Sequence, residues 1–186
     1  MHAAEQPWRA ISLAIDTPLG WPDAFLALLT GSAPDALPTS KARNPLLMRA
    51  TERWLAERRE RPPLSPVQDL IGSQSTKGMA FLQALGLETT EPGVWTGELE
   101  GIQVIAIETY PAACRGSAVV TEQRSALTQQ VVGEHQDIHD ALTCALVARL
   151  FANEREALAA PPAGISVREG WIWVPSDTLR EPQPSR

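Results

Sequence analysis

Three acidic side chains, those of Asp16, Glu108 and Asp140, have the types and placing that point most clearly to chemistry. Asp16 ends the short apolar run 11–15, and Glu108 ends the β-branched run 102–107. Such runs are typical of strands buried on both faces of a parallel sheet. Because open α/β sheets bind their ligands at the carboxyl ends of the strands, two strands that end in carboxylates predict a shared site.

Asp140 completes this predicted site from a helix expected over residues 137–151, with Asp137 one turn before it on the same helical face. Carboxylates are the ligands that Mg²⁺ and Mn²⁺ prefer, and a cation relieves the repulsion between crowded acids. Two such ions can activate a water molecule and stabilise a leaving oxygen. We therefore expect Asp16, Glu108, Asp140 and Asp137 to hold Mg²⁺ or Mn²⁺ for phosphodiester hydrolysis. Any one of these acids, taken alone, is better explained as a solvated or helix-capping carboxylate.

Two arginines, Arg49 and Arg53, lie one turn apart in a helix predicted over residues 45–59. They are candidate substrate-binding residues, as is Arg43, because guanidinium groups bind phosphates through paired hydrogen bonds. A solvated helix face explains the same arginines equally well.

Two histidines, His135 and His139, have the spacing at which one helical face can hold zinc. The zinc-protease pattern needs a glutamate after the first histidine, and Gln136 stands there instead. His139 is better explained as a helix-end residue near Asp140. The sequence also has no glycine-rich phosphate loop after a strand and no nucleophile elbow, which disfavours nucleotide kinases and serine or cysteine hydrolases.

The composition is that of one globular domain, with 186 residues of which 44% are hydrophobic. A net charge of −6 argues against binding nucleic acid by bulk electrostatics, although it leaves room for a locally basic cleft. Cys114 and Cys144 follow no metal-ligand spacing, so we expect reduced thiols in a cytoplasmic protein. No apolar run is long enough to span a bilayer, and the N-terminus lacks the apolar core of a signal peptide.

Apolar periodicity and turn residues predict an α/β order of elements. The small and acidic flank of the helix at 137–151 is expected to face the sheet, and Trp171 and Trp173 are expected to pack from a strand rather than stack on bases. The predicted elements are a first strand at 11–15, helices at 22–29, 45–59, 76–85, 121–132 and 137–151, an irregular stretch at 64–75, a hairpin at 94–99 and 102–108, strands at 165–167 and 170–175, and a disordered tail at 176–186.

A series of motifs, in this order, resembles the domain-of-unknown-function family 429, whose members are described as predicted nucleases of the ribonuclease-H-like fold. The resemblance covers residues 11–175, and the ordered series is more specific than any one motif. The motifs are Ala-Ile-Asp-Thr-Pro-Leu-Gly-Trp-Pro at 14–22, Arg-Ala-Thr-Glu-Arg at 49–53, Pro-Leu-Ser-Pro at 63–66, Ile-Gly at 71–72, Glu-Thr-Tyr-Pro-Ala-Ala at 108–113, His-Asp-Ala-Leu at 139–142 and Glu-Gly-Trp-Ile at 169–172.

The resemblance implies a three-layer domain with a mixed, mainly parallel sheet, in which Asp16 and Glu108 lie on adjoining parallel strands and Asp140 on the closing helix. Family members usually open with a Gly-x-Asp strand and two antiparallel strands, and the first acidic ligand lies on that opening strand. Residues 1–10 are too few for such a unit. We therefore expect an N-terminally incomplete domain, with residues 1–9 as the remnant of the first helix.

Three functions follow from these patterns. The first is a metal-dependent nuclease that hydrolyses phosphodiesters of nucleic acid. The second is a non-catalytic binding or scaffold module of the same fold, which could form a homodimer through an exposed sheet edge. The third is an ATP-hydrolysing relative, which the lack of glycine-rich phosphate loops disfavours.

Overall fold

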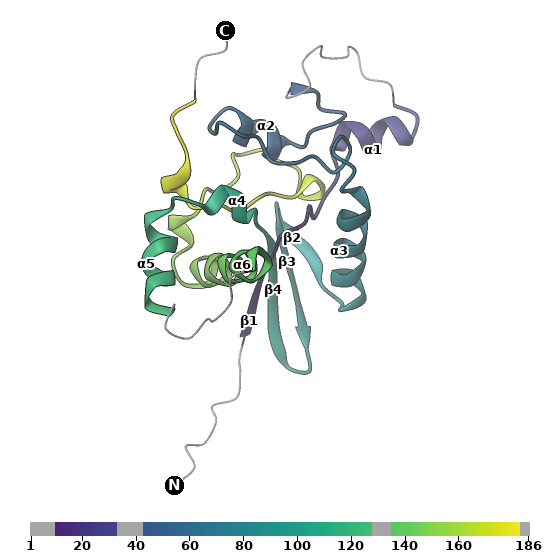
Figure 1. The fold of residues 1–186 in the computed structure, drawn as a ribbon. Helices are drawn as coiled ribbons and strands as arrows, with labels where there is room; N and C mark the ends of the chain where they lie inside the picture. Colours follow the sequence, from purple (N-terminus) through teal and green to yellow (C-terminus); the bar gives the residue numbers. More distant parts are fainter. Residues whose placement is uncertain (1–9, 33–42, 128–134, 183–186) are drawn as a thin grey trace.

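The protein is an α/β fold, seen here in a computed structural model that describes residues 10–32, 43–127 and 135–182 (Figure 1). In these ranges it has six α-helices and one four-stranded sheet. The elements in chain order are β1 (Ala10–Ile15), α1 (Asp23–Leu29), α2 (Ala50–Ala56), α3 (Gly72–Ala84), β2 (Glu88–Glu91), β3 (Val94–Leu99), β4 (Ile102–Glu108), α4 (Pro111–Cys114), α5 (Ala118–Leu127) and α6 (Gln136–Asn153).

The sheet has the strand order β1-β4-β3-β2 and is mixed. Only β1 and β4 are parallel, while β4 with β3 and β3 with β2 are antiparallel. The expectation of a mainly parallel sheet was therefore wrong for the described strands. The reason is the short connections, because two-residue turns such as Glu100-Gly101, both at positive φ, join only antiparallel neighbours.

Helices cover both faces of the sheet (Figure 1). Along β4, Ile105 and Ile107 pack into the core on the side of α6, whereas Val104 and Ala106 pack into the core on the side of α3. This alternation follows from the two-residue period of a strand. The first strand was predicted to be buried on both faces, but the side chains of β1 are only half-buried or exposed, because β1 is an edge strand that pairs with β4 alone among the described strands.

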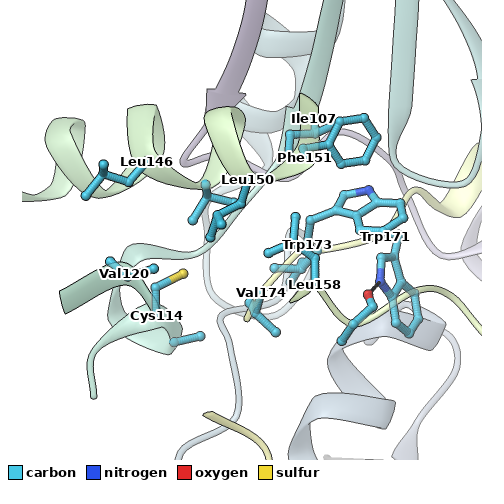
Figure 2. Packing of buried hydrophobic residues seen from close by; sticks show 14 of the residues in the cluster. Ile107, Cys114, Val120, Leu146, Leu150, Phe151, Leu158, Trp171, Trp173 and Val174 are labelled. Carbon is cyan, nitrogen blue, oxygen red and sulfur yellow. Dashed lines mark hydrogen bonds between the residues drawn. The ribbon is translucent and has the colours of Figure 1, made fainter. Parts of the chain in front are cut away.

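The larger core lies between α6 and the segment 171–174 (Figure 2). Trp171 and Trp173 are fully buried there, so the prediction that they pack is confirmed. The predicted strand around them was wrong, since this segment makes only the isolated bridge Glu108↔Ile172. Trp173 meets Phe151 of α6 edge-on, at 4.9 Å between ring centroids.

Several element boundaries differ from the sequence-based expectation. The helix expected from residue 45 begins at Ala50, because the Glu52 carboxylate accepts a hydrogen bond from the Arg49 amide and fixes the helix start there. The stretch expected to be irregular up to residue 75 already contains the first turn of α3. The residues expected as a remnant of the first helix, the second half of the helix predicted at 121–132 and the last four of the predicted tail lie outside the described residues.

Candidate functional site

The carboxyl ends of β1 and β4 border a pocket of about 220 Å³. The amide of Thr109 donates to the carbonyl of Ile15 at 3.0 Å, which ties the two strand ends together. Both Asp16 and Glu108 line the pocket, as the strand-end argument predicted. The other lining residues are Thr17, Pro18, Pro63, Leu64, Ile71, Gln74, Thr109, Tyr110 and Ile172.

The register of β1 on β4 separates the two predicted ligands. Ile15 pairs with Glu108, so Asp16 lies one residue beyond the position opposite Glu108. Side chains one residue apart along a strand point to opposite faces of the sheet. Glu108 follows the face of Ala106 toward α3, while Asp16 follows the face of Ala14, which packs in the core beside α6. The two carboxylates therefore share a pocket but face different layers.

Glu108 is held by an arginine rather than left free for a cation. Arg49 donates from both terminal nitrogens to the two Glu108 oxygens, at 2.7 and 2.6 Å. The Leu19 amide donates to Glu108 Oε2 at 2.8 Å. Because Leu19 lies three residues after Asp16, the Glu108 carboxylate fixes the loop that carries Asp16.

Arg49 also binds Glu52 through its Nε atom at 2.7 Å, and all three charged side chains are buried. Burial alone lowers the pKa of Arg49, but the negative charges of Glu108 and Glu52 overcome this and raise it above its ordinary value. Burial raises the pKa of Glu52 in spite of Arg49. Arg49 was predicted to bind substrate, but in this structure its guanidinium is fully buried and occupied by Glu52 and Glu108. Arg53 donates only to the Arg49 carbonyl, at 3.4 Å, and touches no acid of the site.

Asp16 is exposed and makes no hydrogen bond or ion pair with another described residue. Its pKa is raised to about 6, first by desolvation and then by the negative charges of Asp140 and Glu108. Next to it, the hydroxyl of Thr17 is shielded from solvent without a hydrogen-bond partner in the described part of the chain. The ionised form of Asp16 is therefore disfavoured, and no described cation compensates its charge.

Asp140, on α6, is half-buried, and its negative charge acts on the Asp16 carboxylate. Its Oδ1 atom accepts a hydrogen bond from Gln136 at 2.7 Å, and Arg115 lies 3.7 Å from the same atom. Cys144, one turn further along α6, also lies within the field of Asp16. The expectation that the small and acidic flank of α6 faces the sheet therefore holds only in part, because Asp140 and Cys144 lie within reach of Asp16 whereas Asp137 and Ala141 of the same flank are exposed.

The remaining predicted ligands point elsewhere. Asp137 is largely exposed and pairs with His135 at 3.3 Å. His139 instead contacts Arg124 of α5, so the two histidines serve different partners. Among residues 10–32, 43–127 and 135–182, no three histidine, cysteine or acidic side chains lie together as a metal site. The predicted set of four carboxylates is therefore not assembled there.

A smaller donor set fits a hard cation. Mg²⁺ is usually bound by one or two carboxylates, with water and substrate phosphates as its other ligands. Asp16 and Asp140 are two such carboxylates, both reachable from solvent. The pKa of Asp16 is raised first by desolvation and then by the negative charges of Asp140 and Glu108, and a cation would offset the part that comes from these charges. The donor chemistry at this pair is all oxygen, as Mg²⁺ and Mn²⁺ require.

Glu169 is a structural residue of the site that sequence reasoning missed. Its two oxygens accept hydrogen bonds from the amides of Asp23 and Ala50, at 2.8 and 2.7 Å, so one carboxylate caps the first turns of α1 and α2. The Glu169 carbonyl accepts from Arg49 at 3.1 Å. The sequence signals for it were an acid beside the apolar segment that follows and its place in the motif Glu-Gly-Trp-Ile at 169–172, neither of which indicated a helix cap.

No protein-family model, no curated protein and no solved structure matches this chain. In the part of the chain described here, none of the helices combines the length and the apolar character that crossing a bilayer demands.

Proposed function

We propose that this protein is a metal-dependent phosphodiester hydrolase, a nuclease of the ribonuclease-H-like fold that uses Mg²⁺ or Mn²⁺. The observation that carries the proposal is the Asp16 carboxylate, whose pKa is raised to about 6 by desolvation and by Asp140 and Glu108, at the mouth of a pocket. Perturbed acids that lack a structural partner and line a cleft are concentrated at functional sites.

The finer fold assignment belongs to the same proposal. Its support is one parallel pair of strands, β1 and β4, that end at neighbouring acids, with α6 packed against β1 and carrying a third acid. These are the parts that the resemblance to the domain-of-unknown-function family 429 implies. A fold by itself does not specify an activity, so the argument for hydrolysis depends on the acids and the pocket.

The chain's own residues have distinct roles in this proposal. Asp16 and Asp140 hold the cation. When bound, the cation would activate a water molecule and stabilise the leaving oxygen of a phosphodiester. Glu108 is a positioning residue, because with Arg49 it fixes the Leu19 amide and hence the loop after Asp16.

Metal binding at this pair depends on pH. A ligand carboxylate must be deprotonated, and with a pKa of about 6 only about a tenth of Asp16 is ionised at pH 5. An ordinary aspartate would be almost fully ionised there. We therefore expect affinity for Mn²⁺ to fall as the pH is lowered from 7.5 to 5.

Calorimetric titration with Mn²⁺ and cleavage of labelled DNA and RNA oligonucleotides test the proposal. The wild type should bind Mn²⁺ and cleave, and Asp16→Asn and Asp140→Asn should each lose both properties. Glu98→Gln is the matched control, because Glu98 is exposed on β3 near the hairpin turn, at the opposite end of the sheet. Absence of metal binding in the wild type would overturn the proposal.

The second candidate is a non-catalytic binding module of the same fold. The observation that favours it is the Arg49 clamp, which occupies both oxygens of Glu108. The outer edge of β1, which pairs with no other strand in the described part of the chain, would let such a module form a homodimer. A protein that neither binds Mn²⁺ nor cleaves, but doubles its mass with concentration in light scattering, fits this candidate. Ser12→Pro should then restore the monomer, because the Ser12 amide faces away from β4 whereas those of Ile15, Leu13 and Ile11 face it.

A further inference from the structure

A second hollow, of about 570 Å³, is lined by five arginines, which we call the arginine pocket. Two carboxylates also line it, Glu60 and Asp177, so its formal charge is +3 in a chain whose net charge is −6. A concentration of positive charge against the sign of the whole molecule is the pattern of an anion-binding surface. The five arginines are Arg58, Arg59, Arg61, Arg115 and Arg180.

Three of these guanidiniums have no short ion pair with a described carboxylate. Arg61 makes no hydrogen bond or ion pair with another described residue, and Arg115 is exposed at 3.7 Å from Asp140. Arg59 donates only to backbone carbonyls, while its Nε atom is shielded without a partner. Burial lowers the pKa of Arg59, which indicates that its positive charge is only weakly compensated. An incoming anion would supply the missing acceptors.

The arginine pocket is connected to the carboxylate site by two residues. Tyr110 lines both the arginine pocket and the pocket that holds Asp16. Arg115, from the loop after α4, lies between the arginine pocket and Asp140. An anion bound by the arginines would therefore extend directly toward the proposed metal ligands.

We infer that the arginine pocket binds the phosphate backbone of a single nucleic acid strand and guides it to Asp16 and Asp140. This inference rests on the proposed function for the role of the strand as substrate, but the binding itself needs no metal. A hollow of this size admits the backbone of one strand, whereas a duplex would only lie across its rim. Tyr110 at the junction offers an aromatic face on which a base can stack.

The arginine pocket takes the substrate-binding role that the sequence predicted for Arg49 and Arg53. Arg49 is buried among acids, and Arg53 does not line the arginine pocket. The arginines of the pocket come from the segment after α2, the loop after α4 and the segment after 175, so no single sequence motif contains them.

Fluorescence anisotropy with a labelled single-stranded 12-mer, in EDTA and over a series of salt concentrations, tests the inference. The wild type should bind with an affinity that falls with salt. Arg61→Gln/Arg115→Gln should bind more weakly and lower the slope of log K against log salt by about 1.4, because each phosphate that is no longer neutralised lowers it by about 0.7. Lys77→Gln/Arg149→Gln is the charge-matched control, with both residues exposed elsewhere, and should behave as the wild type.

The outcomes separate this inference from the proposed function. Asp16→Asn should still bind the oligonucleotide in EDTA, even though it cannot cleave. If the wild type does not bind, or if the two double variants weaken binding equally, the inference is overturned while the metal proposal stands. Inorganic triphosphate should compete less well than the unlabelled 12-mer at equal phosphate concentration. If the two compete equally, the inference is overturned, since the pocket would then hold a compact phosphate ligand.

Discussion

At the scale of single residues, the site depends on which acids are neutralised and which are not. Glu108 and Glu52 are bound by one buried arginine, Arg49, whereas Asp16 has no partner and carries the raised pKa. A buried charge that loses its partner is far more costly than an exposed one. The sequence does not distinguish these acids, because each ends or begins a regular element in the same way.

Arg49→Met should destabilise the fold by about 3–5 kcal/mol, because it leaves two buried carboxylates unpaired. Urea unfolding followed by circular dichroism gives the difference. Arg53→Met, which removes only a 3.4 Å bond to a carbonyl, should cost much less. If Arg49→Met does not fold, the triple variant Arg49→Met/Glu52→Gln/Glu108→Gln should fold again, and its failure to do so would contradict the ion-pair explanation.

Asp16→Asn should stabilise the metal-free protein at pH 7.5. The folded-state pKa of about 6 lies above the ordinary 3.8, so the folded state binds the proton more tightly, and the Asp16 contribution to stability falls as the pH rises through this window. Asp16→Asn has no carboxylate to ionise, so its stability does not fall in this way. The difference between its Tm and that of the wild type should therefore become smaller as the pH approaches 4. Thermal scans from pH 4 to 8 measure the difference, and an excess that is the same at every pH would contradict the prediction.

At the scale of elements, two short helices depend on a residue far from them in the chain. α1 and α2 have seven residues each, and isolated helices of that length are not stable in water. Glu169 caps both helices from outside, and Gly20 allows its approach, because a Cβ atom on Gly20 would lie 2.3 Å from the Glu169 carbonyl oxygen. Long-range capping thus replaces a local side-chain cap at α1, and at α2 it adds to the local contact of Glu52 with the Arg49 amide.

Glu169→Ala should lower the free energy of unfolding by about 2–4 kcal/mol, because it leaves two helix amides without acceptors. Glu169→Gln retains one acceptor oxygen and should lose less. Chemical denaturation compares both with Glu156→Ala, which removes an exposed carboxylate and should change little. Equal losses in the alanine and glutamine variants would mean that charge, and not hydrogen bonding to the two helices, is what matters.

At the scale of the whole molecule, the segment 171–174 joins parts of the fold that lie far apart in sequence. The indoles of Trp171 and Trp173 lie side by side in the core (Figure 2). The indole of Trp171 donates to the carbonyl of Ala159 at 2.8 Å, and that of Trp173 donates to the carbonyl of Gly93 at 3.2 Å. Gly93 can lie this close to the segment because it has no side chain. A Cβ atom on Gly93 would lie only 2.4 Å from the Trp171 carbonyl oxygen. The packing of these indoles therefore links the β2–β3 turn with α6.

Trp173→Phe should cost about 1–3 kcal/mol, since it leaves a small cavity and removes the hydrogen bond to Gly93. The midpoint of urea unfolding measures this cost. Leu29→Ala, at a side chain that is 67% exposed, should have almost no effect on the midpoint. A Trp173→Phe midpoint equal to that of the wild type would contradict the central place of this residue in the core.

Much of the fold could be predicted from local patterns. The hairpin at 94–99 and 102–108, the helix of residues 23–29 and the long helix that carries Asp140 all appear where apolar period and turn residues put them. The segment around Trp171 and Trp173 was misassigned as a strand, because an alternating apolar run also suits an irregular segment buried on all sides. The turn at Glu100-Gly101 correctly indicated the antiparallel hairpin, whereas the mainly parallel sheet was inferred from the apolar runs and from the resemblance, and it was wrong because only β1 and β4 are parallel.

The sequence by itself determined that acids lie at the ends of β1 and β4 and on α6, because hydrophobic period and strand-ending prolines are local properties. Only the tertiary structure decided their chemical states. The register of Ile15 on Glu108 turns Asp16 and Glu108 to opposite faces, and the packing of the α2 start places Arg49, 59 residues away in the chain, against Glu108. Register and partner choice depend on the packing of whole elements, and no spacing along the chain specifies them.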